Sequence, residues 1–505
     1  MTFKDKNILV VGLARSGTGA ANLLSSLGAR VTITDNKDRS SLELNIKRLL
    51  SSVKVVTGGN PPEIFDTADM IVISPGVPLN IPPLERARVK GIPIIGELEL
   101  AYQVMKEMGY GLWDMGHELA AGDNITYPLP LTPYPDFIGI TGTNGKSTTT
   151  TLVDLMLKEA GFKTLLGGNI GIALTEEIFE AVSGQQSAVS MGERPFAPTL
   201  IDYIVTEISS FQLETIKEFR PKIAAILNIT PDHLDRYEHM QEYIEAKERI
   251  SENQTSGDFL ILNADDPLLM KLGSEKLGVR SEKPNIFYFS RMREVEGIYL
   301  KDEMIYCNLP HFSVPTSHFP LISQNEIKIQ GVHNIENAMA ASLTALIAGC
   351  SFDAVRKVLE KFSGLEHRLE FVSEIRGVKF INDSKGTNVG AVAKSLEGFN
   401  NVILIMGGLD KGSDFSILKD MVKQKVKSLV LIGKAKGKIA KALEGVTETL
   451  IADDINSAVE LSLSKASAGD VVLLSPGCAS FDMFLDFEDR GRKFKEAVKQ
   501  LKVKS

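Results

Sequence analysis

Short apolar runs that end at a small or polar residue and lead into a helical stretch recur along the chain. The first run is followed by a glycine-rich turn over residues 12–17 and by a helical pattern from Thr18 to Leu27. Strands that alternate with helices favour a doubly wound, mostly parallel sheet. The expected strands of this first block are Asn7–Val11, Val31–Thr34 and Met70–Ile73.

The same alternation begins again near Phe137 and near Gly364. In both blocks, residues able to do chemistry follow the predicted strands directly. Ligands of open α/β sheets bind beyond the carboxyl ends of the strands, so we expect binding sites there. The expected strands are Phe137–Ile140, Tyr203–Thr206, Ile223–Leu227 and Phe259–Leu262 in the second block, and Lys379–Ile381, Val402–Met406 and Val471–Leu474 in the third.

Two stretches fit this alternation less well. Gln103–Asp136 contains the only tryptophan, a glycine-rich patch and several prolines, and Gly184–Thr199 is polar with scattered glycine and proline. We interpret the first as an inserted linker with one helix and the second as a surface loop.

The segment Thr141–Ser147, which reads T-G-T-N-G-K-S, lies between a predicted strand and a helical stretch from Thr148 to Ala160. Strand, glycine-rich turn, Lys-Ser and helix is the layout that surrounds nucleotide phosphates with backbone N–H groups. The usual motif has one more glycine, where this chain has Ile140. The segment predicts ATP binding, with Lys146 at the terminal phosphates and the Ser147 hydroxyl at Mg²⁺.

The turn Gly12-x-Ala14-x-x-Gly17 differs by one residue from the dinucleotide fingerprint, and Asp35 stands where a ribose-binding acid would stand. An NAD-dependent dehydrogenase is therefore an alternative. Ala14 argues against it, because the second glycine of the fingerprint lets the backbone approach a pyrophosphate. A helix start suited to a diphosphate, or a purely structural turn, are the other interpretations.

Further polar residues follow the strands of the second block. Glu207 is either a Mg²⁺ ligand or a solvated loop residue, and His233 is either a ligand of a second metal ion or a capping or core histidine. Taken alone, Lys247 reads as a solvated lysine on a helix over Glu242–Ile250. Asn334 and Asn337 precede an alanine-rich helix, and they either cap this helix or hold the seam between two domains.

Composition narrows the class of protein. The chain has 505 residues, 43% hydrophobic and 24% charged, which favours a globular protein of about three domains. Its net charge of −8 and the lack of a long basic block argue against nucleic-acid binding. No leader or membrane-length apolar run is present, so we expect a cytoplasmic protein without membrane association. The three cysteines are expected to be reduced and buried.

Beyond these separate signals, the chain resembles the Mur ligases over nearly its whole length. The motifs that carry the resemblance are G-T-N-G-K-S at 142–147, G-G-N-I-G at 167–171, E-I-S-S-F-Q-L-E at 207–214, D-H-L-D-R-Y at 232–237, N-A-D-D at 263–266, G-V-H-N-I-E-N at 331–337, H-R at 367–368, N-D-S-K-G-T-N at 382–388, G-G-L-D-K-G-S at 407–413 and S-P-G-C-A-S-F-D-M-F at 475–484. The central motifs are shared with folylpolyglutamate synthases. The motifs at 382–388 and 475–484 point to the D-glutamate-adding type.

The resemblance implies a reaction and its substrates. The carboxylate of UDP-N-acetylmuramoyl-L-alanine would attack the γ-phosphate of ATP, and D-glutamate would displace phosphate from the resulting acyl phosphate. It implies a monomer that uses ATP and Mg²⁺. Another amino-acid ligase of the superfamily and a nucleotide-sensing module without chemistry are the alternatives.

The resemblance also assigns residues to roles. Catalysis would involve Lys146, His233, Lys247, Arg368 and Lys385. ATP would be bound by Gly142, Thr143, Asn144, Gly145, Lys146, Ser147, Thr148, Asn263, Arg368 and Asp383. The UDP substrate would be bound by Arg15, Ser16, Gly17, Thr18, Asp35, Asn36, Gly76, Asn169, Ser209 and Gln212. D-Glutamate would be bound by Thr387, Lys411, Ser480 and Phe487. Metal ions would be held by Ser147, Glu207, His233 and a carbamylated Lys247.

Together these observations predict three α/β domains: a Rossmann-like domain over residues 1–97 for the UDP end, a P-loop ATPase-like domain with a mostly parallel sheet over 98–364, and a Rossmann-like domain over 365–505 for the amino acid. Because Arg368 and Lys385 lie far from the phosphate loop in sequence, closure of the last domain would complete the site.

Overall fold

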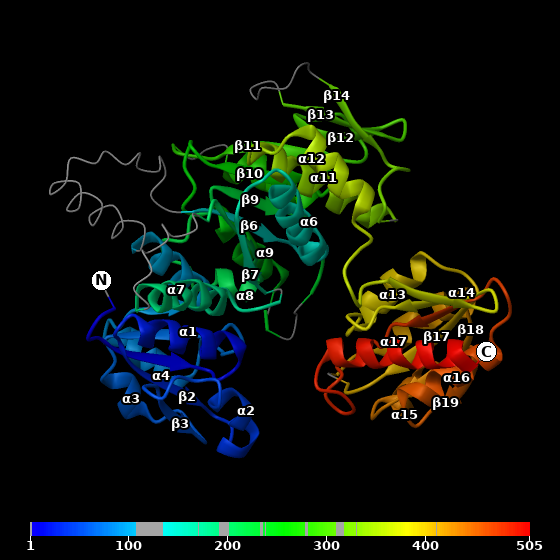
Figure 1. Ribbon diagram of the computed structural model, residues 1–505, viewed down its shortest axis with the longest axis horizontal. Helices are drawn as coiled ribbons and strands as arrows, with labels where there is room; N and C mark the ends of the chain where they lie inside the picture. Colours follow the sequence, from blue (N-terminus) through cyan, green and yellow to red (C-terminus); the bar gives the residue numbers. More distant parts are fainter. Residues whose placement is uncertain are drawn as a thin grey trace. The chain divides into compact units, whose positions relative to one another are not determined.

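The computed structural model describes residues 3–107, 135–169, 171–190, 201–232, 236–237, 239–277, 281–309, 318–329, 331–410 and 412–504. The chain divides into two compact units, residues 1–362 and 363–505 (Figure 1). Within the described residues, no helix is long and apolar enough to cross a bilayer. Each unit is an α/β assembly with its own hydrophobic clusters.

The first sheet of unit one is fully parallel, with strand order β3-β2-β1-β4-β5 over the described residues. The chain order reverses between β1 and β4, which is where open α/β sheets bind ligands. Its strands are β1 (Asn7–Val11), β2 (Arg30–Asp35), β3 (Lys54–Thr57), β4 (Met70–Ile73) and β5 (Ile94–Gly96). Its helices are α1 (Arg15–Ser26), α2 (Glu43–Ile46), α3 (Pro62–Asp66) and α4 (Pro82–Val89).

The second sheet of unit one has the order β14-β13-β12-β11-β10-β9-β6-β8-β7 where the chain is described. Pairing is parallel from β7 to β12 and antiparallel for β13 and β14. The strands are β6 (Asp136–Thr141), β7 (Thr164–Gly168), β8 (Tyr203–Glu207), β9 (Ile223–Ile226), β10 (Phe259–Asn263), β11 (Asn285–Ser290), β12 (Gly297–Lys301), β13 (Met304–Asn308) and β14 (Phe319–Ser323).

Helices cover this second sheet, and α6 packs against both α11 and α12 (Figure 1). The alanine-rich sequence of α11 allows its close approach to α6, and these two helices share a buried apolar cluster with the sheet. The helices are α6 (Lys146–Glu159), α7 (Leu174–Ser190), α8 (Ser210–Leu213), α9 (Met240–Glu248), α10 (Pro267–Lys271), α11 (Val332–Ile347) and α12 (Phe352–Lys361).

Unit two contains the third sheet, ordered β15-β16-β20-β17-β18-β19 and parallel except for the β15–β16 pair. The strands are β15 (Glu370–Ile375), β16 (Val378–Asn382), β17 (Val402–Gly407), β18 (Val426–Ile432), β19 (Glu448–Ile451) and β20 (Val471–Leu474). The helices are α13 (Val389–Glu397), α14 (Lys419–Lys425), α15 (Lys436–Ala442), α16 (Ile455–Lys465) and α17 (Phe487–Lys504).

Some sequence expectations need correction. Helices α1 and α6 begin earlier than predicted, at Arg15 and Lys146, so the last residues of both loops already lie in the first helical turn. Residues 184–190 belong to α7 rather than to a loop, and the rest of that stretch lies outside the described residues. Asn334 and Asn337 lie inside α11, whose N-cap is Gly331, so neither caps it. Most of the 103–136 linker is also outside the described residues.

Candidate active site

The phosphate loop connects β6, an inner strand of the second sheet, to α6. Gly142 and Gly145 have φ angles of 149° and 84°, which side chains other than glycine rarely adopt. A Cβ atom on Gly145 would also lie 2.1 Å from the Asn337 side-chain oxygen, so α11 closes the loop from outside. Glycine is therefore required at both positions. The loop leads directly into the N-terminus of α6.

Two lysine side chains meet at one carbonyl oxygen of this loop. Lys146 Nζ donates to Gly142 O and to Thr143 O, each at 2.9 Å, and Lys247 Nζ donates to Gly142 O at 2.8 Å. Lys247 is 1% exposed, so its interpretation as a solvated lysine is wrong. Burial, with the nearby charge of Lys146, lowers the pKa of Lys247 to about 6. Much of this amine is therefore uncharged and nucleophilic at neutral pH.

Neighbouring side chains that we did not assign to the site hold the loop in place. Asn228 Oδ1 accepts from Asn144 N at 2.8 Å, and Asn228 Nδ2 donates to Asn144 O at 3.1 Å. The hydroxyls of Thr143 and Tyr243 are 3.1 Å apart, and Lys247 Nζ lies 4.6 Å from the centre of the Tyr243 ring. Their positions in the sequence could have indicated these residues, because Asn228 follows the end of β9 and Tyr243 is one helical turn before Lys247.

Glu207, at the end of β8, is 3% exposed and adjoins the loop strand β6. Its Oε1 atom accepts from Asn169 Nδ2 at 2.8 Å. Its Oε2 atom is buried without a hydrogen-bond partner among the described residues, as are the hydroxyls of Thr141 and Thr206. Buried polar atoms are nearly always satisfied, so these oxygens fit a cation that binds oxygen ligands.

The remaining residues predicted to bind ATP or metal ions differ in where they lie. Ser147 and Thr148 lie in the first turn of α6. Asn263, at the end of β10, uses its side chain inside the fold, donating to Leu227 O at 3.1 Å and accepting from Asp265 N at 2.9 Å. His233 lies outside the described residues. Among the residues that are described, no group of three or more His, Cys, Asp or Glu could hold a metal ion.

The predicted UDP end lies at the switch point of the first sheet. Asp35 accepts from Leu13 N at 2.8 Å and from Lys37 N at 2.9 Å, so its carboxylate shapes the β1–α1 loop. A Cβ atom on Gly17 would lie 1.8 Å from Gly12 O, so this glycine permits close helix–strand packing. The other predicted residues around this loop are Arg15, Ser16 and Thr18 in α1, exposed Asn36 after β2, and exposed Gly76 after β4.

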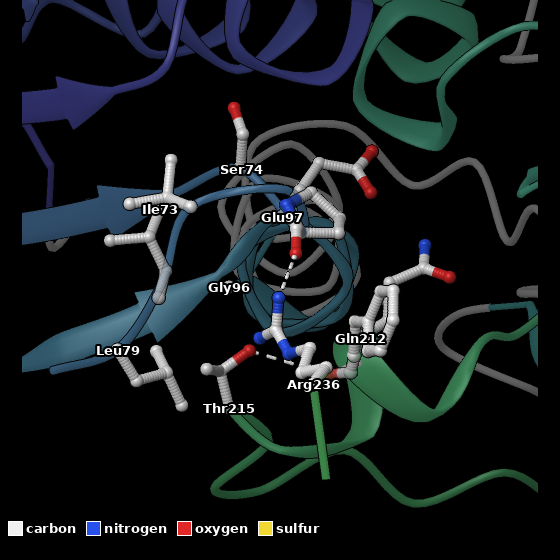
Figure 2. Close-up of a pocket in the computed structure, with 11 residues that line it drawn as sticks. Ile73, Ser74, Leu79, Gly96, Glu97, Gln212, Thr215 and Arg236 are labelled. Carbon is white, nitrogen blue, oxygen red and sulfur yellow. Dashed lines mark hydrogen bonds between the residues drawn. The ribbon is translucent and has the colours of Figure 1, made fainter. Parts of the chain in front are cut away.

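A small pocket joins this end of the first sheet to α8 of the second (Figure 2). Ser209 and Gln212, both predicted to contact the UDP substrate, form the capping box of α8, and Gln212 lines the pocket. Arg236 crosses the pocket, donating to Pro75 O at 3.2 Å and to Glu214 at 2.7 Å. Of the residues predicted to contact the UDP substrate, only Gln212 is among those that line this pocket, and the first sheet contributes Ser74, Pro75 and Val77, the sequence neighbours of Gly76.

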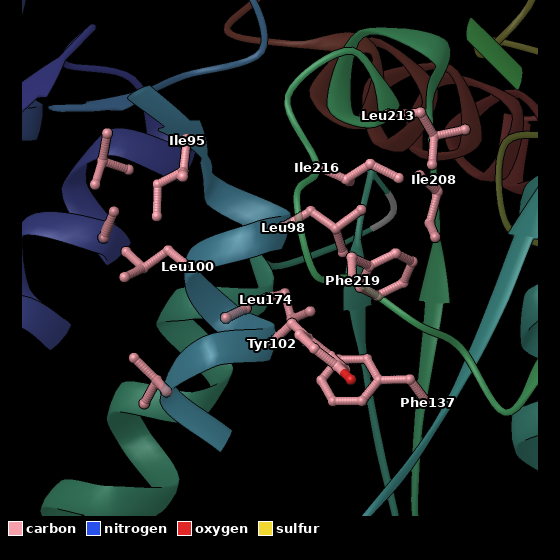
Figure 3. Close-up of a cluster of buried hydrophobic side chains, with 14 of the residues drawn as sticks. Ile95, Leu98, Leu100, Tyr102, Phe137, Leu174, Ile208, Leu213, Ile216 and Phe219 are labelled. Carbon is pink, nitrogen blue, oxygen red and sulfur yellow. The ribbon is translucent and has the colours of Figure 1, made fainter. Parts of the chain in front are cut away.

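A helix over residues 97–107 fastens the first sheet to the second. Its buried Glu97 accepts from the Thr175 N–H and hydroxyl at 2.8 and 3.0 Å, and burial raises the pKa of Glu97. Glu99 accepts three backbone N–H bonds, from residues 217, 218 and 219. Figure 3 shows the apolar cluster around this helix, in which Leu98 and Tyr102 lie near Phe137 and Phe219. The contact between the first and second sheets is therefore a buried hydrophobic core rather than a hinge.

In unit two, four of the predicted residues lie on two loops, residues 382–388 and 475–480, which we call the paired loops. They are Asp383, Lys385, Thr387 and Ser480, whereas Arg368, Lys411 and Phe487 lie outside these loops. Asp383 Oδ2 accepts from the hydroxyls of Ser395 at 2.7 Å and Ser475 at 2.8 Å, and burial raises the pKa of Asp383 to about 6. Lys385 Nζ lies 3.8 Å from the centre of the Phe487 ring. Ser480 is buried and Thr387 is half-buried, whereas Lys411 lies outside the described residues. Arg368 is half-buried, and its charge lowers the Asp383 pKa slightly against the effect of burial.

Comparison with known proteins identifies the family. Family models match in order: the MurD-like N-terminal domain over residues 6–96, the Mur ligase middle domain over 140–345, and the Mur ligase glutamate ligase domain over 367–478. The UDP-N-acetylmuramoylalanine–D-glutamate ligases of Koribacter versatilis and Geobacter metallireducens are each 41% identical to the chain, over 504 and 507 residues that cover 99% of both proteins. The chain belongs to the Mur ligase family. Both the predicted family and the predicted α/β fold class are confirmed.

Solved structures of Mur ligases agree on the fold. The UDP-N-acetylmuramate–alanine ligase of Thermotoga maritima superposes with a TM-score of 0.57 at 18% identity, covering 98% of this chain and all of the other. A pseudomurein peptide ligase of Methanothermus fervidus gives 0.52 at 17% identity, covering 99% of this chain and all of the other. This Mur ligase is thus an ATP-dependent ligase, and the dehydrogenase alternative falls away.

Proposed function

We propose that this Mur ligase joins D-glutamate to UDP-N-acetylmuramoyl-L-alanine through an acyl phosphate, releasing ADP and phosphate. Relatives named for that reaction match the chain end to end at 41% identity. The structural observation that carries the proposal is the meeting of Lys146 and Lys247 at Gly142 O. It lies on the same sheet edge as the unsatisfied carboxylate oxygen of Glu207.

In the first step, a carboxylate oxygen of the alanyl end attacks the γ-phosphorus of ATP. The bond from that phosphorus to the β–γ bridging oxygen breaks, and ADP leaves. The backbone N–H groups at the start of α6 bind the phosphates, and the Lys146 ammonium neutralises charge as two anions approach.

Mg²⁺ fits this site because Glu207 presents a buried oxygen without a partner beside the loop. Ser147, Glu207, His233 and a carbamylated Lys247 would hold the metal ions. When bound, Mg²⁺ withdraws negative charge from the phosphate oxygens. Asn169 orients Glu207 through its hydrogen bond to Oε1.

Carbamylation of Lys247 is supported by its low pKa and its burial. The uncharged amine attacks CO₂, a new N–C bond forms, and one proton leaves to solvent. The product is an anion in place of an uncharged amine. It would place a negative charge beside Lys146, which shares the Gly142 carbonyl acceptor with Lys247.

In the second step, the amine of D-glutamate attacks the acyl carbon, the acyl–oxygen bond breaks, and phosphate leaves while the amine loses a proton. Thr387, Lys411, Ser480 and Phe487 would hold the amino acid, and Arg368 and Lys385 would contact the phosphates. Asp383 is better suited to shaping the first of the paired loops than to binding ATP, because its Oδ2 atom already accepts hydrogen bonds from the hydroxyls of Ser395 and Ser475. The UDP end would bind along Arg15–Thr18, Asp35, Asn36 and Gly76.

The test is ADP release from the full-length protein with ATP, Mg²⁺, UDP-N-acetylmuramoyl-L-alanine and one acceptor at a time. D-Glutamate should support turnover, whereas L-glutamate and meso-diaminopimelate should not. Turnover with another acceptor alone would contradict the proposed substrate. Tight ATP binding without hydrolysis for every acceptor would favour a nucleotide sensor. Domain limits at residues 97 and 364, a monomeric state and a cytoplasmic location stay predictions.

A further inference from the structure

Arg490 is a fully buried side chain near the start of α17, outside every predicted set. Its Nε donates to Ser384 Oγ at 2.9 Å, its Nη2 to Ser384 O at 2.8 Å, and its Nη1 to Cys478 O at 3.1 Å. All three acceptors are uncharged, and no carboxylate of the described residues forms an ion pair with Arg490. Asp383 and Asp482 lie near enough for their charges to raise the pKa of Arg490, but neither accepts one of these hydrogen bonds. Burying a cation whose hydrogen bonds end on uncharged oxygens is costly, so stability alone explains this residue poorly.

These contacts tie three segments together. Ser384 lies in the first of the paired loops, and its hydroxyl donates to Phe487 O, the first residue of α17, at 2.8 Å. Cys478 lies in the second of the paired loops, which also bonds to the first through Gly477 N and Gly386 O at 2.8 Å. The side chain of Arg490 therefore lies at the junction of both loops and the helix start.

The surroundings favour the planar fork of arginine. Nε and Nη2 both address Ser384, one its hydroxyl and the other its carbonyl, which a lysine ammonium could not reproduce with the same geometry. A Cβ atom on Gly408, just after β17, would lie 3.3 Å from Arg490 Nη1 and 2.3 Å from Ala479 O. The guanidinium is thus enclosed. Burial lowers the pKa of Arg490 only to about 10, so it stays charged at neutral pH.

We infer that Arg490 is the positioning residue of the acceptor site: it fixes the spacing of the paired loops and holds a positive charge beneath residues proposed to receive an anionic amino acid. This inference rests on the proposed function, which places Thr387, Ser480 and Phe487 in that site and Lys385 at the neighbouring phosphates. Each of these residues is within three positions of Ser384, Cys478 or Arg490 in sequence. Small shifts of such residues weaken binding of a small charged ligand.

The test compares Arg490→Lys with Arg492→Lys, a matched control on the same helix whose side chain is 54% exposed. For each full-length protein, KM for D-glutamate, ATP and the UDP substrate is measured together with Tm. Arg490→Lys should raise KM for D-glutamate about tenfold or more, with the other two KM values within about threefold. Arg492→Lys should leave all three within about twofold.

A second variant, Ser384→Ala, removes one acceptor without removing the charge, and should raise KM for D-glutamate less, in the same direction. An unchanged acceptor KM in folded Arg490→Lys would overturn the inference. An equal rise of all three KM values together with a lower Tm would also overturn it, because it would show that Arg490 only stabilises the fold. If Arg490→Lys does not fold, an unchanged acceptor KM in Ser384→Ala decides against the inference. Wild-type protein that ignores D-glutamate would refute the proposed function instead, and the same comparison with its true acceptor would still decide the role of Arg490.

Discussion

The phosphate loop and the paired loops both bury ionisable side chains, but the hydrogen-bond partners of these side chains differ. Around the phosphate loop, Lys146 and Lys247 compete for one carbonyl, and Glu207 Oε2 has no described partner. In the paired loops, each hydrogen bond of Arg490 ends on an uncharged oxygen of the fold, and Asp383 accepts from two serines. Around the phosphate loop the protein therefore leaves a buried polar atom without a hydrogen-bond partner, whereas Arg490 and Asp383 in the second region have their partners within the protein.

This difference separates groups that act on ligands from groups that position other residues. An unsatisfied buried atom carries a free-energy cost that a bound ligand can remove. A satisfied buried charge already has its partners, so it acts by fixing its neighbours. Substitutions at the phosphate loop should therefore change chemistry, and those beneath the paired loops should change stability and acceptor binding.

The largest effect is expected for Lys146→Ala. Removing the ammonium leaves the charge developing between two anions without its main neutralising group, so kcat should fall by roughly a thousandfold or more. Binding of the UDP substrate, measured by calorimetry, should change little because its proposed contacts lie elsewhere. Near-normal turnover would show that Lys146 has a structural role, like Asp383 and Arg490 at the paired loops, and no catalytic role.

Lys247→Ala should lower kcat by about a hundredfold, because the carbamate would be lost. Short-chain carboxylic acids added to the assay should restore part of the activity, since they supply an anion in the cavity left by the side chain. Glu245→Ala, on the exposed side of the same helix, is the control and should behave like wild type. Full activity of Lys247→Ala without any added acid would remove Lys247 from the site.

Glu207→Gln tests the unsatisfied oxygen directly. The amide keeps the size of the side chain but loses the charge, so the Mg²⁺ concentration for half-maximal activity should rise about tenfold. Because an unsatisfied buried carboxylate is unfavourable without metal, the metal-free variant should be at least as stable as wild type. A clear loss of metal-free Tm would show that the carboxylate serves the fold instead.

The low pKa of Lys247 predicts a pH dependence of stability in CO₂-free buffer. Between pH about 6 and 10.5 the unfolded chain binds a proton at this lysine that the folded chain does not bind. The free energy of unfolding should therefore rise with pH across this window, by roughly 1.4 kcal/mol per unit at most. Lys247→Met should lack this slope in denaturant titrations from pH 7 to 9. Parallel slopes would show that the lysine is charged in the folded protein.

The smallest effect is expected in the paired loops. Ser395→Ala removes one of two hydroxyl donors to Asp383 and should lower the free energy of unfolding by about 1 kcal/mol. KM for ATP should stay within about twofold if Asp383 only shapes its loop. A large rise in KM for ATP at unchanged Tm would instead give Asp383 a direct role with the nucleotide, as the sequence predicted.

The sequence predicted the fold class and the strands β1, β2, β4, β6, β8, β9, β10, β16, β17 and β20, because each of them is a short apolar run with a polar or small residue at its end. It could not predict burial of single polar residues. Lys247 looked solvated because helical periodicity does not show which neighbours cover a helix face. Arg490 escaped notice because its role depends on carbonyls of residues 384 and 478, which are distant in sequence. The other described strands, including the antiparallel edge β13–β14, were not predicted. The roles of the candidate residues stay predictions.

The helix over residues 97–107 has a consequence for cutting and recombining the chain. Its surrounding cluster mixes side chains from Phe3 to Leu277, whereas the clusters of unit two begin only at Leu369. A fragment that ends near residue 96 would therefore expose half of a shared core, and should aggregate when expressed alone. Residues 363–505 keep their own interior, so relatives should exchange this portion as a cassette without a loss of solubility.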